Sequence, residues 1–315
     1  MRVAVLDDYQ HIAEEVADWA SLPEGVTVDF IHEHFADEDA LVEGVGDHDC
    51  IVCMRERTAF PASTLERLPN LRLLVTTGPF NAVIDTAACT ANGITLCGTG
   101  GLLYPTTELT WALILAVTKG IAREDAAVRN GEWQVGMGTG LRGKTLGLVG
   151  VGRLGTATGL IAKAFGMHVI AWSQNLDLGM AHAVDFEAVS KDDLFRRSDV
   201  VSVHYVLSPR SHHLVGAAEL ALMRPSAYVV NTSRGPVIDE DALVDALRSG
   251  RLAGAGLDVF AVEPLPLDHP LRSLPNTVIT PHIGYVTDET YRIFYGDAVA
   301  DIAAFLAGAP VRVIA

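Results

Sequence analysis

The sequence predicts an α/β protein with two doubly wound domains and a cleft between them. Its first hundred residues alternate short β-branched runs with amphipathic stretches, the order that a parallel sheet with crossover helices requires. A second series of the same kind begins at Lys144 and contains a glycine-rich turn directly after its first apolar run. The 315 residues also exceed what one hydrophobic core usually serves, so we expect two domains.

The first series is expected to supply five strands with helices between them. The strands are predicted at residues 3–6, 26–31, 50–54, 71–75 and 94–96. Helical patterns cover residues 12–19, 61–68 and 83–91. The second of these patterns begins with Pro61, which the first turn of a helix tolerates.

Two pairs of metal-binding residue types in this series are explained better without a metal. Cys50 and Cys53 lie inside an apolar run, where free cysteine behaves as a small hydrophobe. His32 and His34 have no second Cys or His pair at metal-ligand spacing nearby, so we expect them in a solvated loop after a strand. No metal site is predicted.

A long helix is expected over residues 104–130, where Gly131 is the stop signal. The second series then supplies strands at residues 145–149, 168–172, 200–204, 228–231, 254–259 and 277–280. A helix over 240–249 is indicated by acidic residues at its start and Arg248 in its last turn, and a final helix is expected near 289–307.

Composition excludes several classes of partner. The formal net charge of −16 disfavours nucleic acid, whose binding depends on clustered Lys and Arg. No apolar run reaches membrane-spanning length, and Asp7 and Asp8 come too early for a signal peptide, so we expect a cytoplasmic protein without membrane contact. Four cysteines are too few for a disulfide framework in a chain of this size.

The glycine-rich turn predicts a dinucleotide site in a Rossmann-like domain. Gly150, Gly152 and Gly155 follow the strand at 145–149 and open an amphipathic helix. The first glycine permits the tight turn, the second lets backbone approach a pyrophosphate, and the third allows close packing of helix and strand. The helix start, which includes Arg153 and Leu154, would present N–H groups and a positive dipole to the phosphates.

The end of the next strand leaves the choice between NAD and NADP open. Ser173 stands where a carboxylate would normally hold the ribose hydroxyls of NAD, and it carries no charge. Repulsion of a 2′-phosphate is therefore missing. Neither Gln174 nor Asn175 offers a positive charge that would attract one.

Three further segments at predicted strand ends carry groups suited to keto-acid chemistry: Ser233-Arg234-Gly235, Val259-Phe260-Ala261-Val262-Glu263-Pro264 and Pro281-His282-Ile283-Gly284. Together with the glycine turn, they resemble the D-isomer-specific 2-hydroxyacid dehydrogenases over nearly the whole chain. The resemblance implies an oxidoreductase that transfers a hydride between a nicotinamide cofactor and a 2-hydroxy or 2-oxo acid. Glyoxylate and hydroxypyruvate reductases are among the relatives it suggests.

By this resemblance, Arg234, Glu263 and His282 are the catalytic residues. His282 would donate a proton to the carbonyl oxygen in reduction and remove it in oxidation. Glu263 would orient the imidazole and favour its protonated form. Arg234 offers a planar fork of donors that matches the substrate carboxylate and carbonyl.

The resemblance also implies a discontinuous layout and further contacts. Residues 1–100 and 285–315 would form the substrate domain, residues 101–284 the cofactor domain, and the helix after Tyr104 the interface of a homodimer. Arg55, Thr77 and Gly78 match substrate-contacting positions, although a structural salt bridge would explain Arg55 equally well. Matching cofactor-contacting positions are Val206, Leu207, Thr232, Asp258 and Gly284.

Two positions depart from the family pattern, and two other functions remain as alternatives. Val206 replaces a usual proline, and Ser173 replaces the strand-end acid. A cofactor-sensing corepressor-like protein could retain the catalytic set. A formate- or phosphite-type dehydrogenase is the other alternative, although formate-type members resemble a Gln–His pair where this chain has Glu263 and His282. The motifs leave the identity of the acid open.

Overall fold

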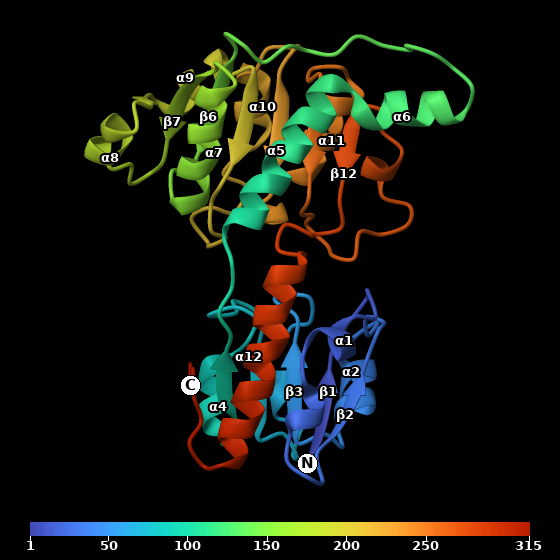
Figure 1. Ribbon diagram of the computed structural model, residues 1–315. Coiled ribbons are helices and arrows are strands. Elements are labelled where there is room, and N and C mark those ends of the chain that lie inside the picture. Colours follow the sequence, from blue (N-terminus) through green and yellow to red (C-terminus); the bar gives the residue numbers. More distant parts are fainter. The chain divides into compact units, whose positions relative to one another are not determined.

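The computed structural model describes all residues 1–315, and the chain divides into two compact units. Unit 1 comprises Met1–Leu102 and Val286–Ala315, and unit 2 comprises Leu103–Tyr285. Each unit is built around one β-sheet whose strand pairs are all parallel (Figure 1). The predicted α/β fold class is confirmed.

The sheet of unit 1 has the strand order β2-β1-β3-β4-β5. Its strands are β1 (Arg2–Val5), β2 (Thr27–Phe30), β3 (Cys50–Cys53), β4 (Leu73–Thr76) and β5 (Thr95–Gly98). Each predicted strand is present, with ends that differ by at most two residues from the expected ones. All four cysteines are free and buried, and burial raises the pKa of the Cys53 thiol to about 12, so these thiols serve as core side chains.

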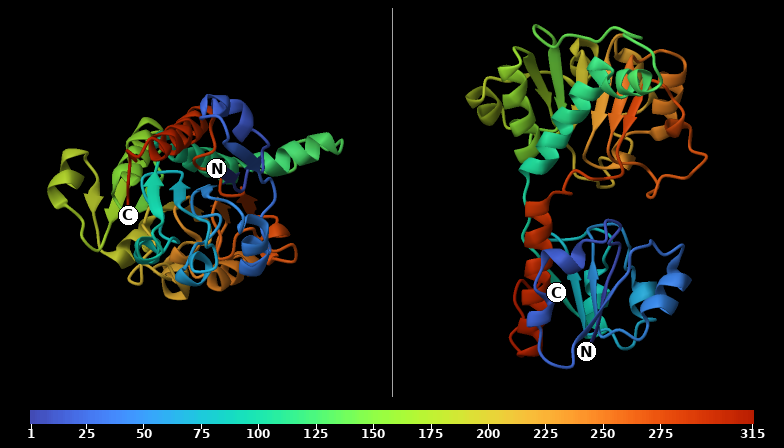
Figure 2. Two further views of the ribbon diagram at one scale, coloured as in Figure 1. Left: turned by 90° about the horizontal axis from the view of Figure 1, so that it is seen from below. Right: turned by 45° about the vertical axis from the view of Figure 1, so that its right-hand side comes forward.

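Helices cover both faces of this sheet. On one face, α2 (Glu38–Val45), α3 (Ala62–Leu65) and α4 (Thr86–Ala91) contribute to a core with alternate strand residues. Two other helices, α1 (Ala13–Val16) and α12 (Asp288–Leu306), pack against each other, and α12 also contacts β4 (Figure 2). The helix expected over 12–19 is shorter, because the chain turns into the 3₁₀ helix η1 (Trp19–Ser21).

His32 and His34 lie in a loop after β2, as expected, and both side chains are partly exposed to solvent. Nδ1 of His34 lies 3.0 Å from Oδ1 of Asp7, and the His32 ring stacks on His11. The loop is drawn onto the sheet because Asp7 is buried and its carboxylate needs partners.

The sheet of unit 2 has the strand order β12-β11-β10-β9-β6-β7-β8. Its strands are β6 (Thr145–Val149), β7 (His168–Trp172), β8 (Glu187–Ala188), β9 (Val200–Val203), β10 (Tyr228–Asn231), β11 (Gly254–Leu257) and β12 (Thr277–Ile279). Two layers of helices enclose it. One buried cluster includes residues of α5 (Tyr104–Lys119) and α7 (Arg153–Ala164), and another includes residues of α9 (Lys191–Arg197), α10 (Ala217–Leu222) and α11 (Glu240–Arg248).

Shorter elements of unit 2 are α8 (Leu178–Ala183), η2 (Gly235–Val237) and η3 (Pro270–Arg272). The single helix predicted over 104–130 is wrong. Gly120 has a φ of 68°, ends α5 and starts α6 (Ile121–Arg129). Glycine adopts this left-handed conformation without the steric penalty that a Cβ brings, so the chain changes direction there. None of the helices is both long and apolar enough to span a bilayer.

Candidate active site

The glycine turn lies where the strand order of unit 2 reverses, between β6 and β9, which is where open α/β sheets bind ligands. Gly150 has a φ of 97°, and a Cβ there would lie 2.5 Å from the backbone oxygen of His204. A Cβ on Gly155 would overlap the backbone oxygen of Gly150. Both positions therefore require glycine for the turn itself.

Gly152 differs, because its φ is −86° and a Cβ there would meet nothing within 4 Å. It is the N-cap of α7, and no side chain caps this end of the helix. The N–H groups of Arg153, Leu154 and Gly155 form the first turn behind it. An uncapped helix start next to an unfilled glycine position fits the pyrophosphate of a dinucleotide.

The end of β7 is occupied by a tyrosine that the sequence interpretation missed. The Tyr205 hydroxyl lies 2.9 Å from the Ser173 hydroxyl and accepts a hydrogen bond from the Gln174 N–H at 2.7 Å. Two neutral hydroxyls therefore stand where a carboxylate would hold a ribose. The predicted adenine-side residues Val206 and Leu207 are exposed, Val206 to 75%.

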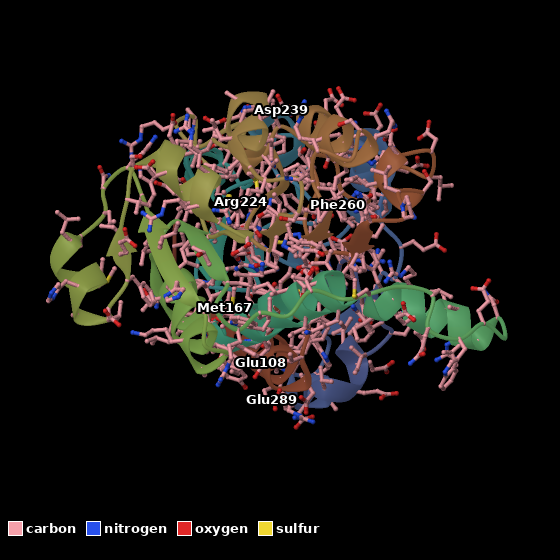
Figure 3. The ribbon with its side chains drawn as sticks, turned by 90° about the horizontal axis from the view of Figure 1, so that it is seen from above. Glu108, Met167, Arg224, Asp239, Phe260 and Glu289 are labelled. Carbon is pink, nitrogen blue, oxygen red and sulfur yellow. The ribbon has the colours of Figure 1, made fainter.

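Glu263 and His282 form a hydrogen-bonded pair, as expected for an acid–base group and its orienting carboxylate. Oε2 of Glu263 lies 2.6 Å from Nδ1 of His282, and Oε1 accepts the N–H of Phe260 at 2.8 Å (Phe260 is labelled in Figure 3). The His282 backbone has a φ of 54°, which is uncommon for a residue with a side chain. Such strain is typical of positions that a surrounding network holds in place.

Asp258 supplies that network. Its Oδ1 accepts hydrogen bonds from the Thr280 hydroxyl at 2.6 Å and the Ile283 N–H at 2.8 Å, and its Oδ2 accepts the Gly284 N–H at 2.9 Å. Burial raises the pKa of the Asp258 carboxyl, although these three bonds oppose the shift. Asp258 thus braces the loop that carries His282.

Arg234 lies at the start of η2, directly after β10. Its Nη1 donates to the Ser233 backbone oxygen at 2.7 Å, and its own backbone oxygen accepts from Asn231 Nδ2 at 3.0 Å. A Cβ on Gly235 would overlap the Phe260 carbonyl group, so the turn that carries Arg234 abuts the loop that carries Glu263. Unit 2 therefore brings the segments of all three predicted catalytic residues together.

Thr232, predicted near the nicotinamide, is buried beside this turn. Its hydroxyl lies 2.7 Å from the hydroxyl of Thr110 on α5. Gly284, predicted for the same region, also accepts a hydrogen bond from Thr106 at 3.1 Å through its backbone oxygen. Helix α5 thus contributes two hydroxyls to this region, which no sequence motif indicated.

The predicted substrate residues of unit 1 also lie together. Nη1 of Arg55 donates to the Thr77 backbone oxygen at 2.9 Å, and a Cβ on Gly78 would overlap this guanidinium. The N–H groups of Thr77 and Gly78 already donate to the Cys53 oxygen and the Thr99 hydroxyl, at 3.0 and 2.7 Å. The Arg55 guanidinium is therefore the richest source of donors in this set.

Comparison with known proteins identifies the family. Residues 111–284 match the model of the D-isomer specific 2-hydroxyacid dehydrogenase, NAD binding domain. The chain is 40% identical to the glyoxylate reductase of Aeropyrum pernix over 254 residues, which cover 78% of this chain and 76% of that protein. It is 31% identical to the hydroxypyruvate reductase of Blautia hydrogenotrophica over 100% of this chain and 99% of the relative.

Solved structures agree. A putative D-3-phosphoglycerate dehydrogenase from Ralstonia solanacearum superposes with a TM-score of 0.95 and 35% identity, over 100% of this chain and 96% of the other. The matched NAD-binding domain contains the glycine turn and the segments of Arg234, Glu263 and His282. The chain therefore belongs to the D-isomer-specific 2-hydroxyacid dehydrogenase family.

Proposed function

We propose that this chain reduces a small 2-oxo acid to the corresponding 2-hydroxy acid, of D configuration where the product is chiral, with glyoxylate and hydroxypyruvate as the first substrates to expect. As a member of its family it is an oxidoreductase that uses NAD and acts on CH–OH donors. The observation that carries the proposal is the 2.6 Å pair of Glu263 and His282 next to the turn of Arg234. The names of the Aeropyrum and Blautia relatives support the choice of substrates.

In this mechanism His282 moves the proton. Because Nδ1 of His282 donates to Glu263, Nε2 is the atom that gives a proton to the substrate oxygen in reduction and takes it back in oxidation. Bound NADH supplies the hydride. Glu263 keeps the ring oriented and stabilises the imidazolium.

Arg234 and Arg55 are the proposed carboxylate-binding residues. The Arg234 fork matches a substrate carboxylate with two parallel donors. In unit 1, Arg55 would do the same, and its guanidinium is held by the Thr77 backbone oxygen at 2.9 Å and by Oε1 of Glu56 at 3.5 Å. For the cofactor side we keep the residues of the glycine turn (Gly150, Gly152, Arg153, Leu154 and Gly155) together with Ser173, Val206, Thr232, Asp258 and Gly284.

For the cofactor, we propose NAD as the first choice with NADP also accepted. Ser173 and Tyr205 are neutral, so they neither repel nor pair with a 2′-phosphate. We expect the specificity constants for NADH and NADPH to differ by less than roughly two orders of magnitude.

The test is a panel of 2-oxo acids assayed with NADH and with NADPH. We expect cofactor oxidation with glyoxylate and hydroxypyruvate. A protein that binds NADH but oxidises it with no 2-oxo acid would contradict the proposal and favour a cofactor-sensing role. Reduction of NAD by formate or phosphite alone would contradict it in favour of the one-carbon or inorganic alternative.

We further propose a homodimer formed through α5 and α6. Helix α6 extends away from the sheet of unit 2 (Figures 1 and 2), and it and the following segment expose large apolar side chains. Ile121, Val128, Trp133 and Met137 are exposed to 56, 51, 76 and 94%. A second copy would cover these side chains. Sedimentation equilibrium should give twice the chain mass, and Val128→Glu should shift it toward one chain.

A cytoplasmic location is also proposed. It is supported by the four cysteines, all of which are free thiols, as is usual in a reducing compartment. Fractionation of the source cells with an antibody against the chain tests this, and recovery outside the cytoplasm would contradict it.

A further inference from the structure

The backbone of Phe260 and Ala261 is held at three points. The Phe260 N–H donates to Glu263 at 2.8 Å, and the Ala261 N–H donates to Oε2 of Glu240 at 3.0 Å. The carbonyl group of Phe260 packs directly on Gly235. These two residues therefore link the turn of Arg234 to the loop of Glu263, and Glu240 holds them from α11, which lies outside both segments.

Glu240 is not needed to cap its own helix. It is the first residue of α11, and Asp239 already accepts the Ala242 N–H at 3.1 Å as the N-cap. The Glu240 side chain is only 18% exposed, and its Oε1 lies 3.2 Å from Nε2 of His269. Its two oxygens are thus divided between the Phe260–Ala261 peptide and one histidine.

The hydrogen bond to Nδ1 of His269 defines its tautomer. Nδ1 accepts the Leu271 N–H at 3.3 Å, so the proton of the neutral ring is on Nε2, which lies 3.2 Å from Oε1 of Glu240. This side chain is 19% exposed and caps the 3₁₀ helix η3. A continuous series of polar contacts therefore runs from Leu271 through His269 and Glu240 to Ala261.

We propose that Glu240 and His269 are positioning residues for the reaction, which keep Glu263 oriented toward His282 by holding the Phe260–Ala261 peptide. The inference deepens the proposed function and rests on it. Without Glu240, the Ala261 N–H loses its acceptor and the backbone of Phe260 and Ala261 can shift. The Phe260 N–H then moves off Oε1 of Glu263, and the carboxylate turns away from Nδ1 of His282. Misplacement by about 1 Å can cost about 100-fold in rate, so a remote carboxylate can matter this much.

The experiment compares Glu240→Ala, His269→Ala and Glu240→Gln with the wild-type protein in NADH-dependent reduction. We expect kcat of the two alanine variants to fall about 10- to 100-fold, while KM for the 2-oxo acid and Kd for NADH change less than about threefold. The alkaline limb of the kcat profile should move to lower pH, because a poorly oriented Glu263 stabilises the imidazolium less. Glu240→Gln keeps an acceptor for the Ala261 N–H and should recover most of kcat.

Glu219→Ala is the matched control. Glu219 also accepts a backbone N–H, from Gly216 at 2.8 Å, and contacts a charged partner, Lys191, at 2.8 Å. Its side chain is 20% exposed, and both of these partners lie outside the Glu263 loop. It should lose a comparable amount of stability with kcat and the pH profile unchanged. If Glu240→Ala and His269→Ala behave like this control, the positioning role is wrong.

A second readout separates this inference from the proposed function. If the wild-type protein reduces no 2-oxo acid, the His282 ring can be titrated by NMR, with its signal assigned through His282→Ala. In Glu240→Ala, the midpoint of this titration should lie at lower pH than in the wild-type protein. An unchanged midpoint in the folded variant overturns the inference whatever the substrate is.

Discussion

The two units differ in the residues that follow the carboxyl end of their first strand. In unit 1, β1 is followed by Asp7 and Asp8, each only 1% exposed. In unit 2, β6 is followed by the glycine turn at 150–155. Both positions border the point where the strand order of the sheet reverses, so the topology alone does not explain the difference.

The chain's own carboxylates occupy this position in unit 1. Asp8 accepts the N–H groups of Ile12 and Ala13 at 3.1 and 3.2 Å, at the start of α1. Asp7 accepts the Thr58 hydroxyl at 2.7 Å. In unit 2, the corresponding helix begins at Gly152 with no side chain over its N–H groups. The two units share this topology, but only in unit 2 are the N–H groups at the helix start left without a side-chain acceptor, as the phosphates of a dinucleotide require.

The largest effect is expected for a substitution at His282, which should lower turnover without weakening cofactor binding in unit 2. His282→Ala should lower turnover about 10²- to 10⁴-fold, because proton transfer by a positioned side chain contributes that much. Kd for NADH, measured by fluorescence, should stay nearly the same, since affinity comes mainly from the glycine turn. A variant that keeps more than about a tenth of wild-type turnover would show that His282 is not the acid–base group.

A smaller but still severe loss is expected for Arg234→Lys. The charge is kept, but an ammonium group cannot reproduce the planar fork that matches a carboxylate. Both kcat and the KM for the 2-oxo acid should worsen, while NADH binding remains. Steady-state kinetics of the two proteins decide the matter, and near-normal kinetics would refute the carboxylate-binding role.

Gly152→Ala tests the open helix start directly. The structure leaves room for the methyl group, so the melting temperature should not change. The added Cβ would meet the pyrophosphate instead, and Kd for NADH should rise roughly tenfold or more, which corresponds to about 1.4 kcal/mol. Unchanged NADH binding in this variant would mean that the pyrophosphate lies elsewhere.

The counterpart in unit 1 should affect stability alone. Asp8→Ala leaves two N–H groups at the start of α1 without their acceptor, which should cost about 1–3 kcal/mol in the free energy of unfolding. Denaturant titration measures this, with Asp18→Ala at an exposed position as the control. Loss of NADH affinity in Asp8→Ala would contradict the assignment of the cofactor to unit 2.

The smallest effect is expected in the pH dependence of stability, through His204, which lies beside the glycine turn. Burial lowers the pKa of His204 to about 4, below its ordinary value of 6.5, so the folded protein holds the ring neutral. The resulting stability is complete above pH 6.5 and is lost as pH falls toward 4, because the unfolded chain takes up the proton first. His204→Gln should remove about 1 kcal/mol of this pH dependence, less than the pKa shift alone would give, because the residue keeps some exposure and solvent weakens the effect. If the free energy of unfolding depends on pH equally in the wild-type protein and in His204→Gln, the His204 ring is not held neutral by burial.

Much of the fold could be predicted from the sequence because the signals are local. The strands β6, β7 and β10 were predicted to the residue, since each is a β-branched or apolar run bounded by polar or glycine positions. The glycine turn and the segments of Arg234, Glu263 and His282 follow strands directly. The rule that parallel strands end at one edge therefore predicts that they gather there, and the pair of Glu263 and His282 is formed.

Tertiary structure alone decided which side chains meet between these segments. Tyr205 contacts Ser173, which lies 32 positions earlier in the sequence. Glu240 contacts both Ala261 and His269, which lie 21 and 29 positions after it. Gly120 likewise breaks a helix that the residue pattern would continue. Periodicity identifies which face of an element is buried, whereas these contacts depend on crossover paths and side-chain directions, which only the packed sheet and its loops determine.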